Sequence, residues 1–166
     1  MSREQRIIAI DPDVDKNGVA ILEKETKTLQ IYSLTFAQVV DMVLSLKGSP
    51  TPVLVIIEGG WLNSGNWHLR NGDSKRVAAA KGRNVGANHE TGKKIVEICE
   101  FYSIPVKVVR PLTKIWGDTM KEKISHDELR QFAPVPSRTN QEERDAVLLL
   151  WNELKLPIKI KRNGNK

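Results

Sequence analysis

The chain has 166 residues, which is enough for one domain with a sizeable core but short for two. No run approaches the roughly 18 apolar residues of a membrane span, and the single cysteine excludes an intrachain disulfide and a thiolate zinc cluster. The first residues, MSREQRIIAI, have neither the apolar core nor the cleavage site expected of a signal peptide. These features predict a cytoplasmic protein without a membrane partner, and they leave open whether it is bacterial or phage-encoded. The net charge of +6 is compatible with a polyanionic ligand without requiring one.

The first half of the chain predicts a sheet-forming region. Three strands are expected at residues 6–11, 18–23 and 29–33. The first is a short, mostly β-branched apolar run that Pro12 stops, and KETK between the other two is typical of a hairpin turn. A helix capped by Thr35 is predicted over 35–46. The apolar run PVLVII within 52–58 is typical of a strand buried on both faces of a sheet.

The second half is predicted to be mainly helical. Residues 59–88 have the composition of a polar loop, rich in glycine, asparagine and bases, with a short helix at 74–81. A helix over 89–102 and a strand over 104–109 follow.

Two capping boxes open the last predicted helices. They are SHDE at Ser125 and TNQE at Thr139, and their helices run to about residues 132 and 154. In the second box the glutamate is Glu142. The order of elements predicts an α/β domain over residues 1–154, in which a three-strand antiparallel meander and parallel strands form a mixed central sheet flanked by helices. Residues 155–166 are predicted to form a basic C-terminal tail.

The stretch DPDVDKNG after the first strand resembles the start of a calcium loop. Residues 13–18 match D-x-D-x-N-G, the first half of an EF-hand loop. An apolar strand follows, however, and the twelfth position is Lys24, where a bidentate glutamate is required. We therefore reject an EF-hand and consider the other acids of the chain.

Three acids at the ends or inner faces of separate predicted elements are expected to converge. Asp11 ends the first strand, Glu58 ends a buried strand, and Asp145 faces the sheet from the last helix. Two of them have a simpler explanation: an Asp-Pro turn for Asp11 and a salt bridge for Glu58. Glu142 lies one turn before Asp145, and its place in the capping box and in the first turn of a helix is a strong alternative explanation for it.

A cluster of these acids predicts a metal centre. Carboxylates gathered at one place repel each other unless cations neutralise them, and oxygen-only ligands favour magnesium or manganese over zinc. Two such ions, about 3.5–4 Å apart, hold the attacking and leaving oxygens of a scissile phosphate. Together with the basic composition, this pattern points to phosphodiester hydrolysis.

The chain resembles the RuvC-like Holliday-junction resolvases of the RNase H-like superfamily. The similar stretches, which span roughly residues 7–151, are IIAIDPDVDKNGVAIL, VLVIIEGGW, GANHETGKKIVEICEFYSIPVKVVRP, and SHDELRQF followed by EERDAVLLLW. The resemblance implies an RNase H-like fold and a magnesium-dependent endodeoxyribonuclease that resolves branched DNA such as four-way junctions as a homodimer. It further implies that two magnesium ions, for which manganese can substitute, are bound by Asp11, Glu58, Glu142 and Asp145.

The resemblance also predicts contacts to DNA. Trp61 stands where an aromatic residue of the family stacks on a base, although anchoring of its own loop is an equal alternative. The predicted phosphate contacts are Lys75, Arg76, Lys81, Arg83, Lys93 and Lys94.

The chain departs from the family pattern at two positions of the site. The usual Asp-Pro-Gly turn has Asp13 in place of its glycine. Glu142 stands where the family more often has Asp or His, and Glu143 is the alternative ligand. Two other functions stay open: a different RNase H-like nuclease that cuts an RNA–DNA hybrid or a flap, and a non-catalytic basic nucleic-acid-binding protein.

Overall fold

A mixed five-stranded sheet forms the centre of the protein, whose computed structural model describes residues 5–63, 72–112 and 123–161. The strands are β1 (Arg6–Asp11), β2 (Asn17–Glu23), β3 (Thr28–Leu34), β4 (Val53–Glu58) and β5 (Val106–Val109). Their order is β3-β2-β1-β4-β5, in which β1 to β3 are antiparallel and β4 and β5 run parallel to β1. This confirms the predicted meander and parallel strands.

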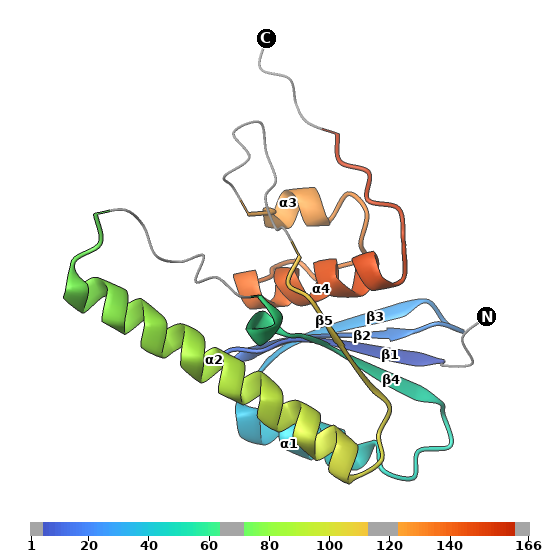
Figure 1. The fold of residues 1–166 in the computed structure, drawn as a ribbon. Helices are drawn as coiled ribbons and strands as arrows, with labels where there is room; N and C mark the ends of the chain where they lie inside the picture. Colours follow the sequence, from blue (N-terminus) through green and yellow to red (C-terminus); the bar gives the residue numbers. More distant parts are fainter. Residues whose placement is uncertain (1–4, 64–71, 113–122, 162–166) are drawn as a thin grey trace.

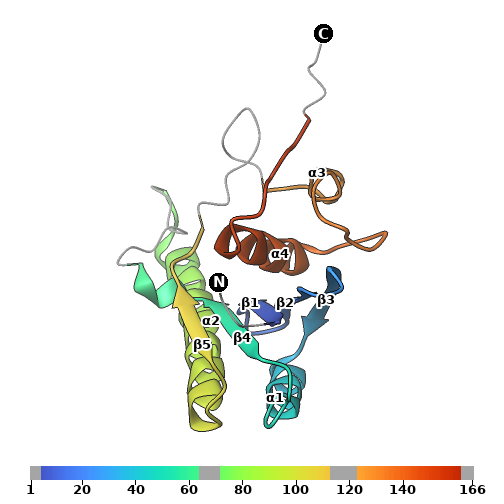
Figure 2. The ribbon, with the colours of Figure 1, turned by 90° about the vertical axis from the view of Figure 1, so that its right-hand side faces the viewer.

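Helices cover both faces of the sheet. They are α1 (Phe36–Ser45), α2 (Lys75–Phe101), α3 (His126–Leu129) and α4 (Gln141–Glu153), with a short 3-10 helix, η1 (Gly60–Leu62), after β4. Figures 1 and 2 show α1 and α2 on one face and α4, with α3 beyond it, on the other. Among the described residues, no helix is both long and apolar enough to cross a membrane.

The core follows the two-residue period of the central strands. Ile7 and Ala9 of β1 pack in the cluster beneath α4, whereas Ile8 and Ile10 pack in the cluster that includes α1 and α2. The side chains of β4 alternate between the two clusters in the same way, and Ile56 packs on the α4 side. A residue's position along β1 or β4 therefore decides which helical layer its side chain meets.

The helix α2 corrects the prediction for residues 59–88. Its 27 residues join the two helices predicted at 74–81 and 89–102, and Ser74 caps its start. Three glycines and two asparagines within α2 gave it the composition of a loop, but α2 contains no proline to interrupt a helix. Gly92 is required there, because a Cβ atom would come within 2.6 Å of the Trp61 ring.

The start of α4 also differs from the prediction. Asn140, and not Thr139, is the N-cap: its side chain accepts a hydrogen bond from the Glu143 backbone, and the Glu143 carboxylate accepts one from the Asn140 backbone. The predicted box was one residue too early, so Glu142 is not a capping residue. Thr139 Oγ1 instead lies 2.9 Å from Nδ1 of His126. The box at Ser125 is confirmed, although α3 ends at Leu129.

The first turn of α4 lies directly against the backbone of β2. A Cβ atom on Gly18 would come within 1.9 Å of the Glu142 carbonyl oxygen. No real side chain fits in that space, so the glycine is what allows the helix to approach the sheet this closely.

We expect Gly18→Ala to lower the free energy of unfolding by about 3 kcal/mol, the upper range for overpacked sites, because the two backbones must separate. Gly82→Ala is the matched control: it lies in α2 with nothing near its Cβ position, and it should raise the free energy by about 0.5–1 kcal/mol. Urea denaturation measures both. A Gly18→Ala variant as stable as the wild type would contradict the placement of α4.

Candidate functional site

Asp11 and Glu58 end neighbouring parallel strands at the same edge of the sheet. The register pairs Ala9 with Ile56 and Ile10 with Ile57, so the next residues in line are Asp11 and Glu58. Both fall in the alternation that faces α4, and both are half-buried. In open sheets with parallel strands, ligands bind at this carboxyl edge.

The helix α4 brings Glu142 and Asp145 over the same edge. Gly18, which touches the Glu142 backbone, is the direct β2 partner of Asp11. Glu142 is half-buried, whereas Asp145, one turn further on, is only 2% exposed. The four predicted acids therefore come from three elements, β1, β4 and α4, that meet at one end of the sheet.

Asp145 already has cationic and polar partners. Lys123 Nζ donates to one carboxylate oxygen at 3.1 Å, and Gln141 Nε2 donates to the other at 2.8 Å. Arg144 donates to the Gln141 side-chain oxygen at 3.0 Å, which fixes the orientation of that amide. A buried carboxylate needs such compensation, and Lys123 provides the positive charge.

The donor chemistry suits a hard divalent cation, although the acids are not gathered into a complete binding group. Among residues 5–63, 72–112 and 123–161, no three acidic, histidine or cysteine side chains are close enough together to hold a metal ion. All four predicted ligands present oxygen, which magnesium and manganese prefer. The Lys123 ammonium shows that a cation is accommodated beside Asp145.

The turn after Asp11 is held by its own side chains and by α2. Asp13 accepts a hydrogen bond from the Asp15 backbone at 2.9 Å, and its own backbone donates to Asn17. Asn88 of α2 donates to Asp13 Oδ2 at 2.9 Å and accepts from the Val14 backbone at 2.8 Å. Asp13 does not adopt a positive φ, so the turn does not need the glycine of the family pattern.

Trp61 lies in η1 and packs against α2 and the Asp11 turn. Its ring lies against Gly92, and Pro12 Cγ is also close to Gly92, 3.1 Å from the position that a Cβ atom would take there. The Trp61 ring meets the His89 ring edge-on, with the ring centroids 6.4 Å apart. Trp61 is partly buried and belongs to the cluster beneath α1 and α2. These contacts support the anchoring alternative, while stacking on a base stays a prediction.

The six predicted phosphate-binding residues all lie on α2 but differ in their partners. Lys81 pairs with Asp73 at 2.7 Å and Lys93 with Glu90 at 2.7 Å, and Lys94 pairs with Glu97. The hydrogen bond and charge of Lys93 lower the pKa of Glu90, and those of Glu97 raise the pKa of Lys94.

The other three bases of α2 are exposed. Lys75, Arg76 and Arg83 form no ion pair with any residue that the structure describes. The buried residues of α2 all lie in its C-terminal half, and Figure 1 shows the N-terminal half extending beyond the carboxyl edge of the sheet. Positive charge without a partner is therefore concentrated in the half of α2 that extends past Asp11.

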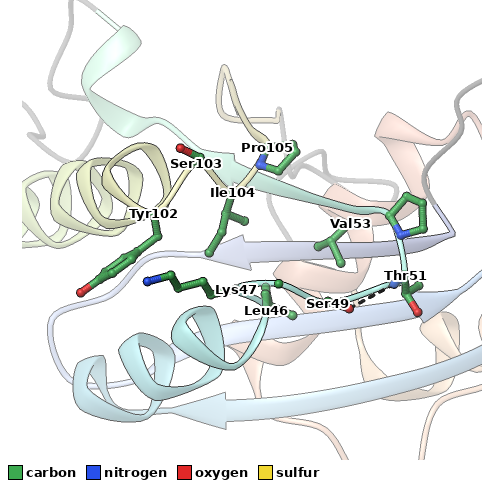
Figure 3. Close-up of a pocket in the computed structure, with 11 residues that line it drawn as sticks. Leu46, Lys47, Ser49, Thr51, Val53, Tyr102, Ser103, Ile104 and Pro105 are labelled. Atoms are coloured by element: carbon green, nitrogen blue, oxygen red, sulfur yellow. Dashed lines mark hydrogen bonds between the residues drawn. The ribbon is translucent and has the colours of Figure 1, made fainter.

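The pocket in Figure 3 lies at the opposite end of the sheet. It has a volume of about 230 Å³ and lies between the end of α1, the start of β4 and the end of α2. Val53 at this end and Glu58 at the other are roughly 16 Å apart at the rise of a strand. The residues that line it include no acid, and Lys47 beside the Tyr102 ring is its only charged side chain. The pocket is separate from the acidic edge.

Cys99, the only cysteine of the sequence, belongs neither to the acidic edge nor to the pocket. Cys99 is buried on the inner side of α2, and burial raises the pKa of its thiol to about 11. It is a core residue that stays protonated at neutral pH.

Sequence reasoning did not find three polar residues beside the acids. Lys123 and Gln141 contact Asp145, and Asn88 holds the Asp13 turn. Gln141 is four residues before Asp145, a spacing that places two helical side chains together, so it was within reach of prediction. Lys123 and Asn88 reach their partners across the fold and carry no local signal.

Comparison with known proteins gives a distant structural likeness. No family model and no curated protein matches the chain. A solved structure of T. thermophilus RuvC in complex with a Holliday junction substrate is similar over 92% of this chain and 98% of that one, with 13% sequence identity and a TM-score of 0.42. This identity and TM-score are too low to transfer residues or an activity.

We expect Asn88→Asp to lower the free energy of unfolding by about 1–2 kcal/mol, because it replaces a donor to Asp13 with a second carboxylate. Adding Asp13→Asn should recover most of the loss, since an amide at position 13 can donate to the new carboxylate. A double-mutant cycle of denaturation free energies measures this coupling. Strictly additive effects would show that the two side chains do not interact.

Proposed function

We propose that the protein is a divalent-metal-dependent endonuclease that cuts branched DNA. The observation that carries this proposal is the meeting of β1, β4 and the first turn of α4 at one edge of the sheet, which brings four acids to the side from which the basic half of α2 extends. The acids would hold the metal and α2 would contact the phosphate backbone.

The metal would be held by four carboxylates, those of Asp11, Glu58, Glu142 and Asp145. Asp11 would be the central ligand of the four, because its strand lies between β2 and β4. When bound, magnesium or manganese would supply an activated water and neutralise charge on the leaving oxygen. The sheet fixes Asp11 and Glu58, and the Gln141 amide orients Asp145. The bound cation would replace the Lys123 ammonium as the positively charged partner of Asp145.

The protein's own surfaces would orient the substrate. Lys75, Arg76 and Arg83 would contact phosphates, which positions a duplex without reading its sequence. A four-way junction has two symmetric strands to cut, and a two-fold homodimer would present one acidic edge to each.

A non-catalytic nucleic-acid-binding protein is the second candidate. The observation in its favour is that Asp145 is already satisfied by Lys123 and Gln141 without a metal. Bound cation should raise the melting temperature if the site is real. No change at millimolar magnesium or manganese, together with no cleavage, would support this second candidate.

We expect Asp11→Asn to retain junction binding while cleavage falls more than about a hundredfold, since even outer-shell partners of a metal are worth 10–100-fold. Cleavage of a labelled four-way junction, a linear duplex and an RNA–DNA hybrid is measured with magnesium. Wild-type cleavage by this variant would refute the site. A junction cut no better than the linear duplex would refute the substrate class, and preferred cleavage of the hybrid would identify a different nuclease.

Glu142 and Glu143 are separated by a paired substitution. Glu143→Ala removes the capping carboxylate and should lower the free energy of unfolding by about 1 kcal/mol while cleavage is kept. Glu142→Ala should leave stability close to that of the wild type and abolish cleavage. The reverse pattern would make Glu143 the ligand.

A further inference from the structure

The segment after α4 is ordered against the core. The side chains of Leu156, Ile158 and Ile160 are partly buried and pack against the hydrophobic cluster beneath α4, while the residues between them are exposed. Figure 2 shows this segment running in an extended course from the end of α4 past α3. It therefore presents one fixed side to the protein and the other to solvent.

Backbone hydrogen bonds hold both ends of the segment. The Leu156 backbone donates to the Trp151 carbonyl at 2.9 Å, and Lys155, at a φ of 52°, turns the chain out of the helix. At the other end the Lys161 backbone donates to the Gln131 side chain at 2.6 Å. The course between these points is fixed by the fold.

Lys155, Lys159 and Lys161 lie on the exposed side, and we call them the lysine strip. Residues 154–161 contain no acid, and none of the three lysines forms an ion pair within the described part of the chain. In an extended chain, residues two apart, such as Lys159 and Lys161, lie on the same side at about 6–7 Å. The exposed Arg130 precedes Gln131, which adds a further base nearby.

We propose that the lysine strip binds the phosphate backbone of a nucleic acid. Exposed lysines close together along the chain and without acidic partners suit a polyanion, and binding would release condensed counterions. An anionic membrane is the less favoured partner, because the apolar side chains of this segment face the core and are not available to enter a lipid surface.

The strip lies on the α4 side of the sheet, whereas α2 covers the other side. The proposal rests on the proposed function in that it gives the same DNA ligand a second contact surface. Two basic surfaces on opposite sides of one domain would contact separate segments of a branched DNA.

The test compares two double variants that each remove two positive charges. They are Lys159→Gln/Lys161→Gln and, as the matched control, Lys27→Gln/Lys47→Gln, which alters exposed lysines outside both basic surfaces. Dissociation constants for a four-way junction are measured from low to moderate salt with EDTA present, so that cleavage plays no part.

The strip variant should reduce the slope of log K against log salt by about 1.8, or about 0.9 for each lost phosphate contact, and the control should keep the wild-type slope. Equal slopes for the two variants would overturn the proposal, as would a wild-type protein that binds no nucleic acid at low salt. Reduced binding to phosphatidylserine vesicles with an unchanged DNA slope would assign the strip to membranes and overturn the proposal as well.

These outcomes are independent of the active site. A strip variant with a reduced slope would support the strip even if Asp11→Asn cleaved at the wild-type rate. Loss of cleavage by Asp11→Asn together with equal slopes would support the active site alone.

Discussion

The contact between α4 and β2 at Gly18 determines the geometry of the whole acidic edge. Two backbones meet there with no room for a side chain, so the first turn of α4 is fixed relative to the strand that pairs with β1. Asp11 lies across from Gly18, and Glu58 follows in the parallel register. The alternation of β1 and β4 turns both acids toward the helix that carries Glu142 and Asp145.

This close packing creates an electrostatic requirement. Asp145 is almost completely buried, and a carboxylate in that position needs positive charge or hydrogen-bond donors. Lys123 and Gln141 provide both within the chain. A divalent cation at Asp145 would compete with the Lys123 ammonium, so metal binding would be coupled to breaking of the ion pair between Lys123 and Asp145. The unpaired bases in the N-terminal half of α2 add positive charge beyond the same edge, which would attract phosphate in the proposed function.

The sequence predicted what local signals specify. Apolar runs located the strands, and the position of Asp11 and Glu58 at the end of such runs placed them at the carboxyl edge. The long helix α2 was missed because its glycines and asparagines resemble a loop, and the close packing of Gly92 on Trp61 is a tertiary requirement. Thr139 and Asn140 both fit the spacing of a capping box, so a one-residue error was possible. The contacts of Asn88 with Asp13 and Lys123 with Asp145 join residues far apart in sequence.

The central claim is that the acids at the carboxyl edge bind a divalent cation. Crystals of the wild-type protein soaked in manganese test it most directly, because anomalous scattering locates manganese independently of the protein atoms. The account predicts manganese coordinated by Asp11 and at least one of Glu58, Glu142 and Asp145, with Lys123 Nζ withdrawn from Asp145. No manganese at this edge, with the ion pair between Lys123 and Asp145 intact, would contradict it.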